Sequence, residues 1–248
     1  MQWSDEAIVL ALRPHGETSA ILEAFTRAHG RHLGLVRGGA SAKRRAVLQP
    51  GNHVRISWRA RLSEHLGVFT VEPLRARAGD MFERRFALAG LNAFAAVASA
   101  VLPEREPHGP AFEAAEALLD AIAGHNFAEW APAYIRWELG LLDELGFGLD
   151  LARCAATGSS ENLVYVSPRS GRAVSAEAGA AYRDKLLILP RFLLGTQECA
   201  LLPADLAAGL ALTAHFLVQW VLGPHERTLP EARRRLGDLA ARARAESD

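Results

Sequence analysis

The basic side chains between Arg31 and Arg61 are the residues of this chain best suited to chemistry. Every charged residue in this stretch is Lys or Arg, and no Asp or Glu interrupts it. Guanidinium and ammonium groups bind phosphate with a strong salt dependence and carry no base-sequence code of their own. The stretch therefore predicts a surface for a nucleic-acid backbone. Arginines on one face of a strand are also common as a plain solvated surface, and this alternative stays open here.

Aromatic side chains that could stack on nucleobases are few in the same part of the chain. Phe25, Trp58 and Phe69 are the candidates. Trp58 falls on the apolar face of its segment, which predicts that it belongs to a hydrophobic core. Without stacking platforms, binding would rest on the phosphates, so we expect little sequence preference.

The chain shows no arrangement typical of catalysis. It has no GxSxG motif, and Gly38-Gly39 is not followed by the Lys-Ser/Thr pair of a phosphate-binding loop. One predicted helix carries Glu138, Asp143 and Glu144. A solvated helix face explains these carboxylates more simply than a general acid–base pair does. The sequence therefore predicts a protein that is not an enzyme.

Metal and disulfide chemistry are also not expected. Cys154 and Cys199 are the two cysteines, and they form neither a CxxC motif nor a paired framework. Structural zinc requires four closely spaced ligands, and the nine histidines supply no HxxxH or HExxH spacing. We expect no metal, no cofactor and a reducing, cytosolic setting.

Alternating apolar and polar residues in the N-terminal third predict a small β-barrel around the basic stretch. Gly- and Pro-containing turns separate the segments, and residues 40–51 between two of them read as a flexible basic loop. Five short strands in about 75 residues are typical of an OB-fold. The expected strands are 6–13, 18–27, 32–37, 52–61 and 67–75.

After Gly79 the apolar period changes to that of helices. Residues 150–178 interrupt the helical pattern with a small hairpin, and the Arg-rich C-terminal tail reads as solvated. The predicted fold class is α+β and multidomain, with a barrel domain at 1–79 and a helical domain at 80–248. The expected helices are 81–102, 111–124, 129–146, 180–195, 204–222 and 230–245.

The neutral total charge hides an asymmetry between these two parts. Residues 1–80 hold 12 Lys or Arg and 7 Asp or Glu, whereas the remaining residues hold 16 and 21. This division predicts two domains with different partners. The longest apolar stretch, residues 86–102, is short of a membrane span, and the N-terminus lacks the apolar core of a signal peptide. We therefore expect a cytoplasmic protein without a membrane partner.

Three segments resemble the RecO family of bacterial recombination mediators. They are EAIVLALRPHGETSAILEAFTRAHGRHLGLVRGG, LQPGNHVRISWRAR with the GVFTVEPL strand, and YIRWELGLLDELGFGLDLARCAATG followed by VYVSPRSGRAVS. The resemblance implies an OB-fold followed by a helical domain with a small zinc-finger-like insertion. It also implies a cytoplasmic, nucleoid-associated DNA repair protein without catalysis.

The resemblance further implies a set of partners. Members bind single- and double-stranded DNA and anneal complementary strands. With RecR, they help to load RecA onto DNA covered by single-strand-binding protein, whose acidic C-terminal tail docks on the helical domain. A different possibility is a protein-interaction module whose basic face binds an acidic partner. A nucleic-acid-modifying enzyme with an OB-fold would need a nucleotide or metal site in residues 81–248, and none is visible.

One feature departs from the family pattern. Many members hold zinc with two CxxC pairs in the insertion, and the corresponding positions here are Cys154, Thr157, Ser175 and Ala178. Three of the four ligands are missing, which predicts an insertion without zinc that is held by hydrogen bonds and apolar contacts. Leu163, Tyr165 and Val174 are examples of side chains expected to make those contacts.

The resemblance also assigns site residues by charge and strand position. For the tail of single-strand-binding protein, Lys185 and Arg191 around the apolar LLILP segment are candidates, although a core helix with two solvated cations explains the pattern equally well. The predicted DNA-contact residues are Arg31, Arg37, Lys43, Arg44, Arg45, Arg55, Arg59 and Arg61.

Overall fold

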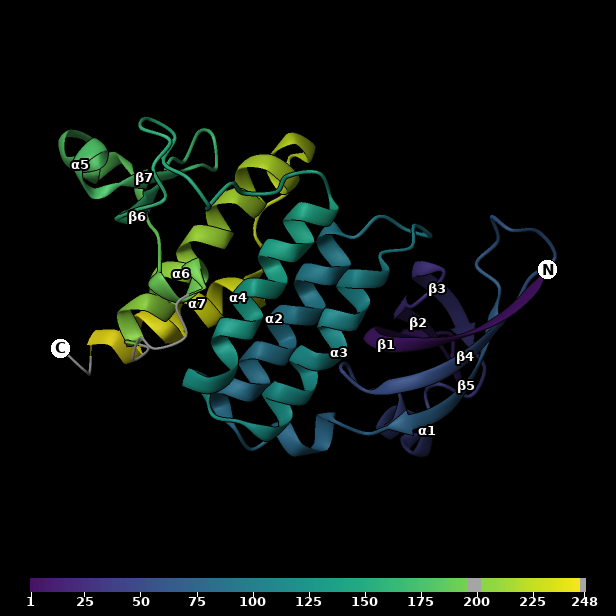
Figure 1. Cartoon of the computed structure of the whole chain (residues 1–248). Helices are drawn as coiled ribbons and strands as arrows, with labels where there is room; N and C mark the ends of the chain where they lie inside the picture. Colours follow the sequence, from purple (N-terminus) through teal and green to yellow (C-terminus); the bar gives the residue numbers. More distant parts are fainter. Residues whose placement is uncertain (196–201, 246–248) are drawn as a thin grey trace. The chain divides into compact units, whose positions relative to one another are not determined.

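The computed structural model describes residues 1–195 and 202–245 (Figure 1). Cys199 lies outside the described residues. The chain divides into two compact units, Met1–His125 and Asn126–Asp248. The first unit begins with a sheet and the second consists mainly of helices. The predicted α+β class, with an N-terminal sheet-rich region and helices after it, is confirmed.

Five strands of the first unit close into a barrel with the order β1-β2-β3-β5-β4. Most neighbouring strands are antiparallel, and a short parallel pairing of β3 with β5, at Leu35 and Val68, closes the barrel. The strands are β1 (Gln2–His15), β2 (Ser19–Thr26), β3 (Gly30–Val36), β4 (His53–Arg59) and β5 (Val68–Arg75).

The barrel core follows from the alternation seen in the sequence. On β4, Val54, Ile56 and Trp58 are buried, while Arg55 and Arg59 between them face solvent. This is the period of two expected for a strand with one buried face. The core therefore collects one face of each strand, and the arginines of β4 stay on the outside.

A glycine allows the chain to approach this core closely before β5. Gly67 has a φ of +66°, and a Cβ on it would lie 2.2 Å from Nε1 of Trp58. The same Nε1 donates a hydrogen bond to the carbonyl oxygen of Leu66 at 3.0 Å. Any larger residue at position 67 would displace the Trp58 ring.

The prediction that residues 40–51 form a flexible basic loop is wrong in one respect. The segment contains the helix α1 (Ala42–Val47). Ser41 is extended at the N-cap, and its carbonyl accepts a hydrogen bond from the backbone N–H of Arg45 at 2.9 Å. Ala, Lys and Arg have high helix propensity, which outweighs the polar character of the segment. Lys43, Arg44 and Arg45 are therefore carried on a helix.

Two longer helices complete the first unit, α2 (Arg85–Val101) and α3 (Gly109–Gly124), after the short 3₁₀ turn η1 (Ala78–Met81). The side chain of Arg77, at the end of the barrel, is 2% exposed. It donates to both carboxylate oxygens of Glu116 at 3.0 and 2.9 Å and to Asp120 at 2.6 Å. These bonds fix α3 to the barrel.

The second unit is built on α4 (Phe127–Glu144), α6 (Pro203–Phe216) and α7 (Glu231–Ala245). A capping box starts α4, in which Asn126 and Glu129 each accept from the other's backbone N–H. After α6 the chain continues as a π-helical turn, η4 (Leu217–Leu222), and a 3₁₀ turn, η5 (Gly223–His225). The helical prediction for these three regions holds, with shifted ends.

The prediction of a solvated side chain is wrong for Glu138 and, within the Arg-rich tail, for Arg233, whereas Arg234, Arg235 and Arg242 are exposed as expected. Glu138 is 0% exposed and Arg233 is 1% exposed. Nε and Nη2 of Arg233 donate to the two carboxylate oxygens of Glu138 at 2.6 and 2.8 Å, and Thr213 donates to the same carboxylate. This buried ion pair joins α4, α6 and α7.

A small sheet with the order β7-β6-β8 lies between α4 and α6 in the sequence. It contains β6 (Leu163–Val166), β7 (Ala173–Ser175) and β8 (Leu187–Ile188), together with α5 (Ala176–Gly179) and the 3₁₀ turns η2 (Ala180–Lys185) and η3 (Arg191–Leu194). The hairpin is as expected. The predicted helix at 180–195 is wrong, because β8 pairs with β6 and Pro190 cannot continue a helix begun before it.

Among the described residues, one helical segment, Pro203–His225, is long and apolar enough to cross a membrane by length and composition. It is longer than residues 86–102, so the expectation about the longest apolar segment is wrong. Its first part, α6, contacts α4 and α7 within the second unit. Burial of an apolar helix inside a helical core gives the same composition.

Candidate nucleic-acid interface

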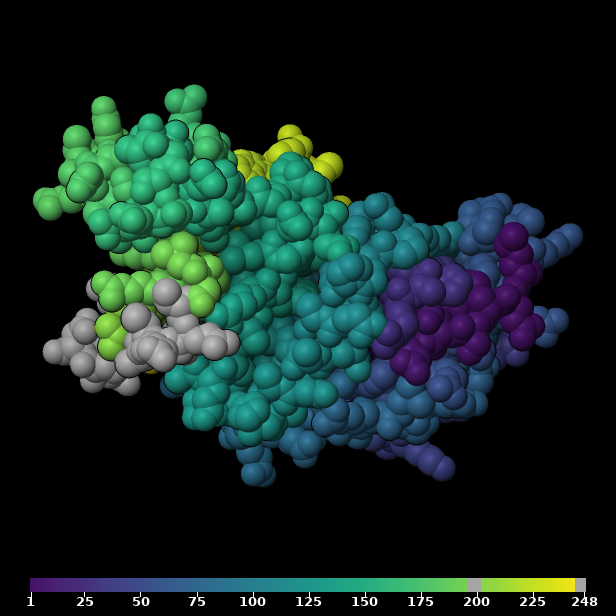
Figure 2. Space-filling view, in the orientation of Figure 1, coloured from purple at the N-terminus to yellow at the C-terminus, as the bar shows by residue number. Residues whose placement is uncertain are grey.

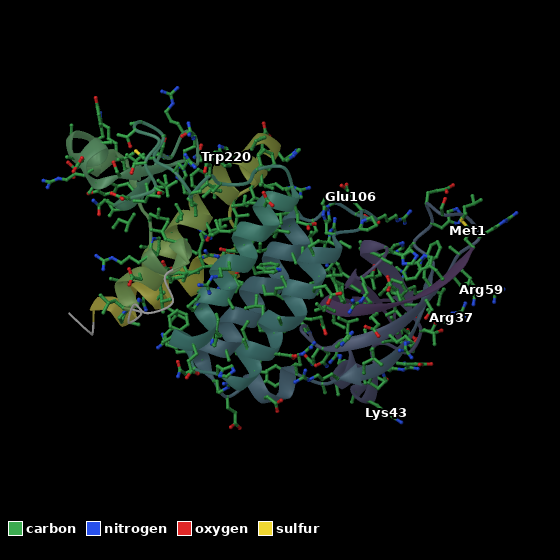
Figure 3. The ribbon with its side chains drawn as sticks, viewed as in Figure 1. Met1, Arg37, Lys43, Arg59, Glu106 and Trp220 are labelled. Atoms are coloured by element: carbon green, nitrogen blue, oxygen red, sulfur yellow. The ribbon has the colours of Figure 1, made fainter. Side chains whose placement is uncertain are left out.

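The outward side of the barrel carries cations that the fold does not neutralise. Among the described residues, no carboxylate pairs with Arg37, Lys43, Arg45, Arg59 or Arg61, and all five side chains are exposed. Figure 3 shows Arg37 and Arg59 near one another at the end of the barrel where Met1 lies, and Lys43 at the lower edge of the barrel. Solvated cations without carboxylate partners match the charge of a phosphate backbone.

Arg37 and Arg59 come from different strands to one hollow of about 490 Å³. Arg37 follows β3 and Arg59 ends β4, and the parallel closure of the barrel brings these ends together. Two hydroxyl groups also line the hollow, that of Ser57 on β4 and that of Thr70 on β5. The full lining is Gln2, Arg37, Ser57, Trp58, Arg59, Val68 and Thr70.

Arg31 is placed differently from the other predicted contact residues. Its Nη1 donates to Glu23 at 2.9 Å and its Nε donates to the carbonyl oxygen of Leu102 at 2.8 Å, and the side chain is 18% exposed. A guanidinium engaged in this way supports the first unit. We therefore do not include Arg31 in the surface proposed below.

Arg44 and Arg55 are exposed but partly engaged. Nη1 of Arg44 donates to the carbonyl oxygen of Val71 at 3.1 Å, which holds α1 against β5. Arg55 lies 3.8 Å from Glu6 across the β1–β4 pairing, a loose pair that solvent screens. Both stay candidate contacts, weaker than the five unpaired cations.

The three aromatic candidates are not stacking platforms. Phe25, Trp58 and Phe69 are at most 2% exposed, and the core assignment of Trp58 is confirmed. The partly exposed aromatic of this face is Trp3, which sequence reasoning missed because the first strand was expected to start at residue 6. The strand starts at Gln2, and Trp3 pairs directly with Trp58 in the β1–β4 register.

The two residues predicted for tail docking have separate surroundings in the second unit. Lys185 ends η2 and is exposed, whereas Arg191 starts η3 and lines a hollow of about 710 Å³. The alternative of a core helix here is wrong, since the segment is a short strand between 3₁₀ turns. The hollow is lined by Leu151, Ala152, Ser160, Asn162, Leu163, Val164, Arg191, Leu193 and Leu194.

The four positions that correspond to the family's zinc ligands lie together but do not fit the metal. The backbone N–H of Ser175 donates to Sγ of Cys154 at 3.3 Å, and the two side chains lie 3.5 Å apart. Hydrogen bonds from Thr157 and Ser175 lower the pKa of Cys154 to about 6. Tetrahedral zinc needs four donors, and one thiol with an alanine at the fourth position cannot supply them.

Among the residues with assigned structure, no group of three His, Cys, Asp or Glu is placed to hold a metal. The insertion is held by other means. Leu163 and Val174 are at least nine-tenths buried, and the Ser175 side chain accepts from the N–H of Ala178 at 3.4 Å to start α5. Hydrogen bonds and apolar contacts thus join the four positions at which the family resemblance predicted metal ligands.

These features define an α+β protein with a basic, phosphate-complementary face on a small barrel. Comparison with known proteins agrees with this class. Residues 1–77 match the family model described as Recombination protein O N terminal, and residues 83–229 match Recombination protein O C terminal. The chain belongs to the RecO family.

Relatives share about half of their residues with this chain over its whole length. The DNA repair protein RecO of Cereibacter sphaeroides is 52% identical over 98% of this chain and 100% of its own length. The proteins of the same name from Phenylobacterium zucineum and Rhodospirillum centenum are 52% and 49% identical, over 98% and 100% of this chain and 99% and 98% of their own lengths. Membership supports a role in DNA repair and confirms the prediction that the protein is not an enzyme.

Proposed function

We propose that this protein binds DNA through the basic face of its barrel and acts as a recombination mediator. In this proposal it anneals complementary strands. With RecR, it helps to load RecA onto single-stranded DNA coated by single-strand-binding protein, in the cytoplasm and in association with the nucleoid. The observation that carries the proposal is a set of exposed cations that have no carboxylate partner in the described part of the chain, namely Arg37, Lys43, Arg45, Arg59 and Arg61.

The exposed cations are better suited to contact the phosphate backbone of DNA than to recognise particular bases. The cations come from the turn after β3, from α1, from β4 and from the segment after β4, so several elements of the barrel region contribute to the surface. Contacts of this kind position a protein on DNA and release counterions without specifying sequence. We infer that single- and double-stranded DNA both bind here.

The five-stranded closed barrel supports an OB-fold assignment, which we propose for residues 1–79. We propose a helical domain at 80–248, in which the sheet near 150–178 is a degenerate form of the family's zinc-finger-like insertion. The N-terminal family model ends at residue 77 and the C-terminal model begins at residue 83. The first compact unit of the structure extends further, to His125, and includes α2 and α3.

The function is tested by measuring DNA affinity at several salt concentrations by fluorescence anisotropy. Replacing Arg37, Lys43, Arg45 and Arg59 by Ala removes phosphate contacts, so affinity falls for all sequences alike. The slope of log K against log salt flattens by about 0.7 per lost contact on single strands and about 0.9 on duplex. A matched control replaces four exposed cations outside the barrel by Ala, namely Arg153, Arg169, Arg172 and Arg183.

The alternative function, an interaction module for an acidic partner, predicts a different result. In that case the unmodified protein shows no DNA binding at low salt, and the barrel variant has no DNA phenotype. An unchanged salt slope in the barrel variant would remove this face from the proposal. A strand-annealing assay on the same samples separates a mediator from a protein that only adheres to DNA.

A further inference from the structure

A second hollow adjoins the cationic one at the same end of the barrel. It has a volume of about 510 Å³ and lies within the first unit. Gln2 and Trp58 line both hollows, so the two share a wall. Residues of β1, β3 and β4 line it together with His29 from the turn between β2 and β3 and with Arg105.

Four aromatic rings, those of Trp3, His29, His32 and Trp58, line this second hollow. Trp3 and His29 stack face to face, with ring centroids 4.0 Å apart and planes 8° apart. His32 meets the edges of Trp3 and Trp58, with centroids 5.2 Å away in both cases. Trp3 and His29 are partly exposed, whereas His32 is buried, so the stack has an accessible outer end. Figure 2 shows the first residues of the chain, in purple, at the surface.

Contacts within the first unit hold the rim of this hollow in place. Asp5 accepts a hydrogen bond from the backbone N–H of Ala28 at 2.7 Å and lies 2.9 Å from Nδ1 of His29, which orients the imidazole ring. On the opposite rim, Arg105 donates to the carbonyl oxygens of Ser63, Glu64 and His65. A site that is formed before binding loses little entropy when it takes a ligand.

The two hollows together match the two halves of one nucleotide. A planar base can stack on the accessible outer end of the Trp3–His29 pair, and base–aromatic stacking accepts any base because every base has a π-face. The phosphate that belongs to that base would reach Arg37 and Arg59, which have no carboxylate partner among the described residues. A base paired in a duplex cannot enter without leaving its stack, which costs free energy.

We propose that the aromatic hollow takes one unstacked base of single-stranded DNA while Arg37 and Arg59 hold the adjoining phosphate. This inference rests on the proposed function and adds to it a preference for single strands. An acidic peptide that ends in an aromatic residue is an alternative ligand, because it also combines a planar ring with negative charge. The further exposed cations Lys43, Arg45 and Arg61 in the same unit favour a ligand with many negative charges, such as DNA.

The test compares oligo(dT) with an abasic oligomer of the same length, at one salt concentration, on the full chain. Both ligands carry the same phosphates, so the difference in affinity reports the bases alone. We expect oligo(dT) to bind at least about fivefold more tightly, with quenching of tryptophan fluorescence. The salt slopes of the two ligands should agree, because the phosphate contacts are shared.

Variants then locate the preference. His29→Ala should remove most of the difference between oligo(dT) and the abasic oligomer and leave the salt slope unchanged. Phe82→Ala is the matched control, because Phe82 is an aromatic residue of the same unit, 49% exposed and outside both hollows. Trp3→Leu is a second variant with the same expected direction, checked for folding by its melting temperature because Trp3 also packs on the barrel core.

Each result decides the proposal. Equal, salt-sensitive binding of oligo(dT) and the abasic oligomer would overturn the base site and leave DNA binding by the basic face intact. Absence of binding to both at low salt would overturn the proposed function itself. Competition by an acidic peptide with an aromatic end, combined with no base-dependent affinity, would assign the hollow to a protein partner instead.

Discussion

At the scale of single residues, buried charge distinguishes this fold most clearly. Arg233 occurs in a run of arginines whose other described members face solvent, yet it enters the core of the second unit and meets Glu138. Its guanidinium also lies 5.6 Å from the centroid of the Tyr134 ring and donates to the carbonyl oxygen of Leu210. A buried ion pair with this many bonds specifies one arrangement of the three helices.

Replacing Arg233 by Met would leave the Glu138 carboxylate buried without its partner. We expect the free energy of unfolding to fall by about 3–5 kcal/mol, measured by urea denaturation. Arg235→Met is the matched control, because Arg235 pairs with Glu231 on the exposed face of the same helix and should change stability little.

A second variant separates the loss of a charge partner from the loss of packing contacts. Combining Arg233→Met with Glu138→Leu removes both charges, so it should recover a large part of the stability that Arg233→Met alone loses. Equal stability of the single and double variants would show that the ion pair matters less than the space that the arginine fills.

At the scale of elements, Glu116 on α3 connects a helix to the barrel by charge. Burial on its own would raise the pKa of this carboxyl, but hydrogen bonds from His53 and Arg77 lower it to about 2. The folded pKa is below the unfolded value of 4.5, so the bonds stabilise the fold fully above about pH 4.5. This stabilisation is lost as the pH falls from about 4.5 towards 2.

Glu116→Gln should therefore be less stable than the unmodified protein by about 3 kcal/mol near pH 7, and the difference should shrink between pH 4.5 and 2. Urea denaturation at a series of pH values measures the difference directly. Glu72→Gln serves as the control, since Glu72 is an exposed carboxylate of β5 without an ion pair among the described residues. A difference that stays constant with pH would contradict the role given to the His53 and Arg77 bonds.

The elements also show which sequence patterns determine local structure here. The alternation on β4 predicted the buried face of the strand and the core position of Trp58, because one side chain in two must leave water. The helical period predicted α2, α3 and α4. The end of a strand is less constrained, and the polar first residues of β1 concealed that Trp3 continues the register opposite Trp58.

Two segments could not be predicted from local pattern, for different physical reasons. Lys43, Arg44 and Arg45 read as a loop, yet high intrinsic propensity makes them a helix. Residues 180–195 read as a helix, yet Leu187 and Ile188 find strand partners on β6. The pairing of Arg233 with Glu138, 95 residues away, is a tertiary contact that no spacing rule contains.

The sequence predicts the positive charge of the candidate site but not the arrangement of its side chains in space. The basic stretch identified the cations, because an absence of acidic neighbours is visible in the sequence itself. Which of them stay unpaired depends on Glu23 reaching Arg31 and on Val71 accepting from Arg44, both set by the barrel. The aromatic hollow depends on β1, β3, β4 and His29, in the turn between β2 and β3, meeting at one end of the barrel.

At the scale of the whole molecule, the two proposed binding surfaces lie on different units. The proposed DNA-contact residues belong to the first unit, whereas the hollow beside Arg191 belongs to the second unit. This hollow has leucine side chains and a cation at its rim, which suits an acidic peptide with an apolar end. We propose it as the docking site for the tail of single-strand-binding protein, with Arg191 as the contact and Lys185 outside the lining.

The two partners should therefore be separable by single substitutions. Arg191→Glu places a like charge against the acidic tail, so we expect roughly tenfold weaker binding to single-strand-binding protein. Affinity for free DNA should stay unchanged, because the barrel cations are untouched and lie in the other unit. Arg169→Glu is the matched control, as an exposed arginine of the second unit that does not line the hollow.

The measurement is anisotropy with single-strand-binding protein that has or lacks its C-terminal tail. Tail-dependent affinity should be lost in Arg191→Glu and kept in Arg169→Glu, with the melting temperature reporting whether Arg191→Glu still folds. Tail-dependent binding that survives in a folded Arg191→Glu variant would exclude this hollow. If the substitutions in the barrel abolish tail-dependent binding instead, one cationic face serves both partners. DNA and the tail of single-strand-binding protein would then compete for that face.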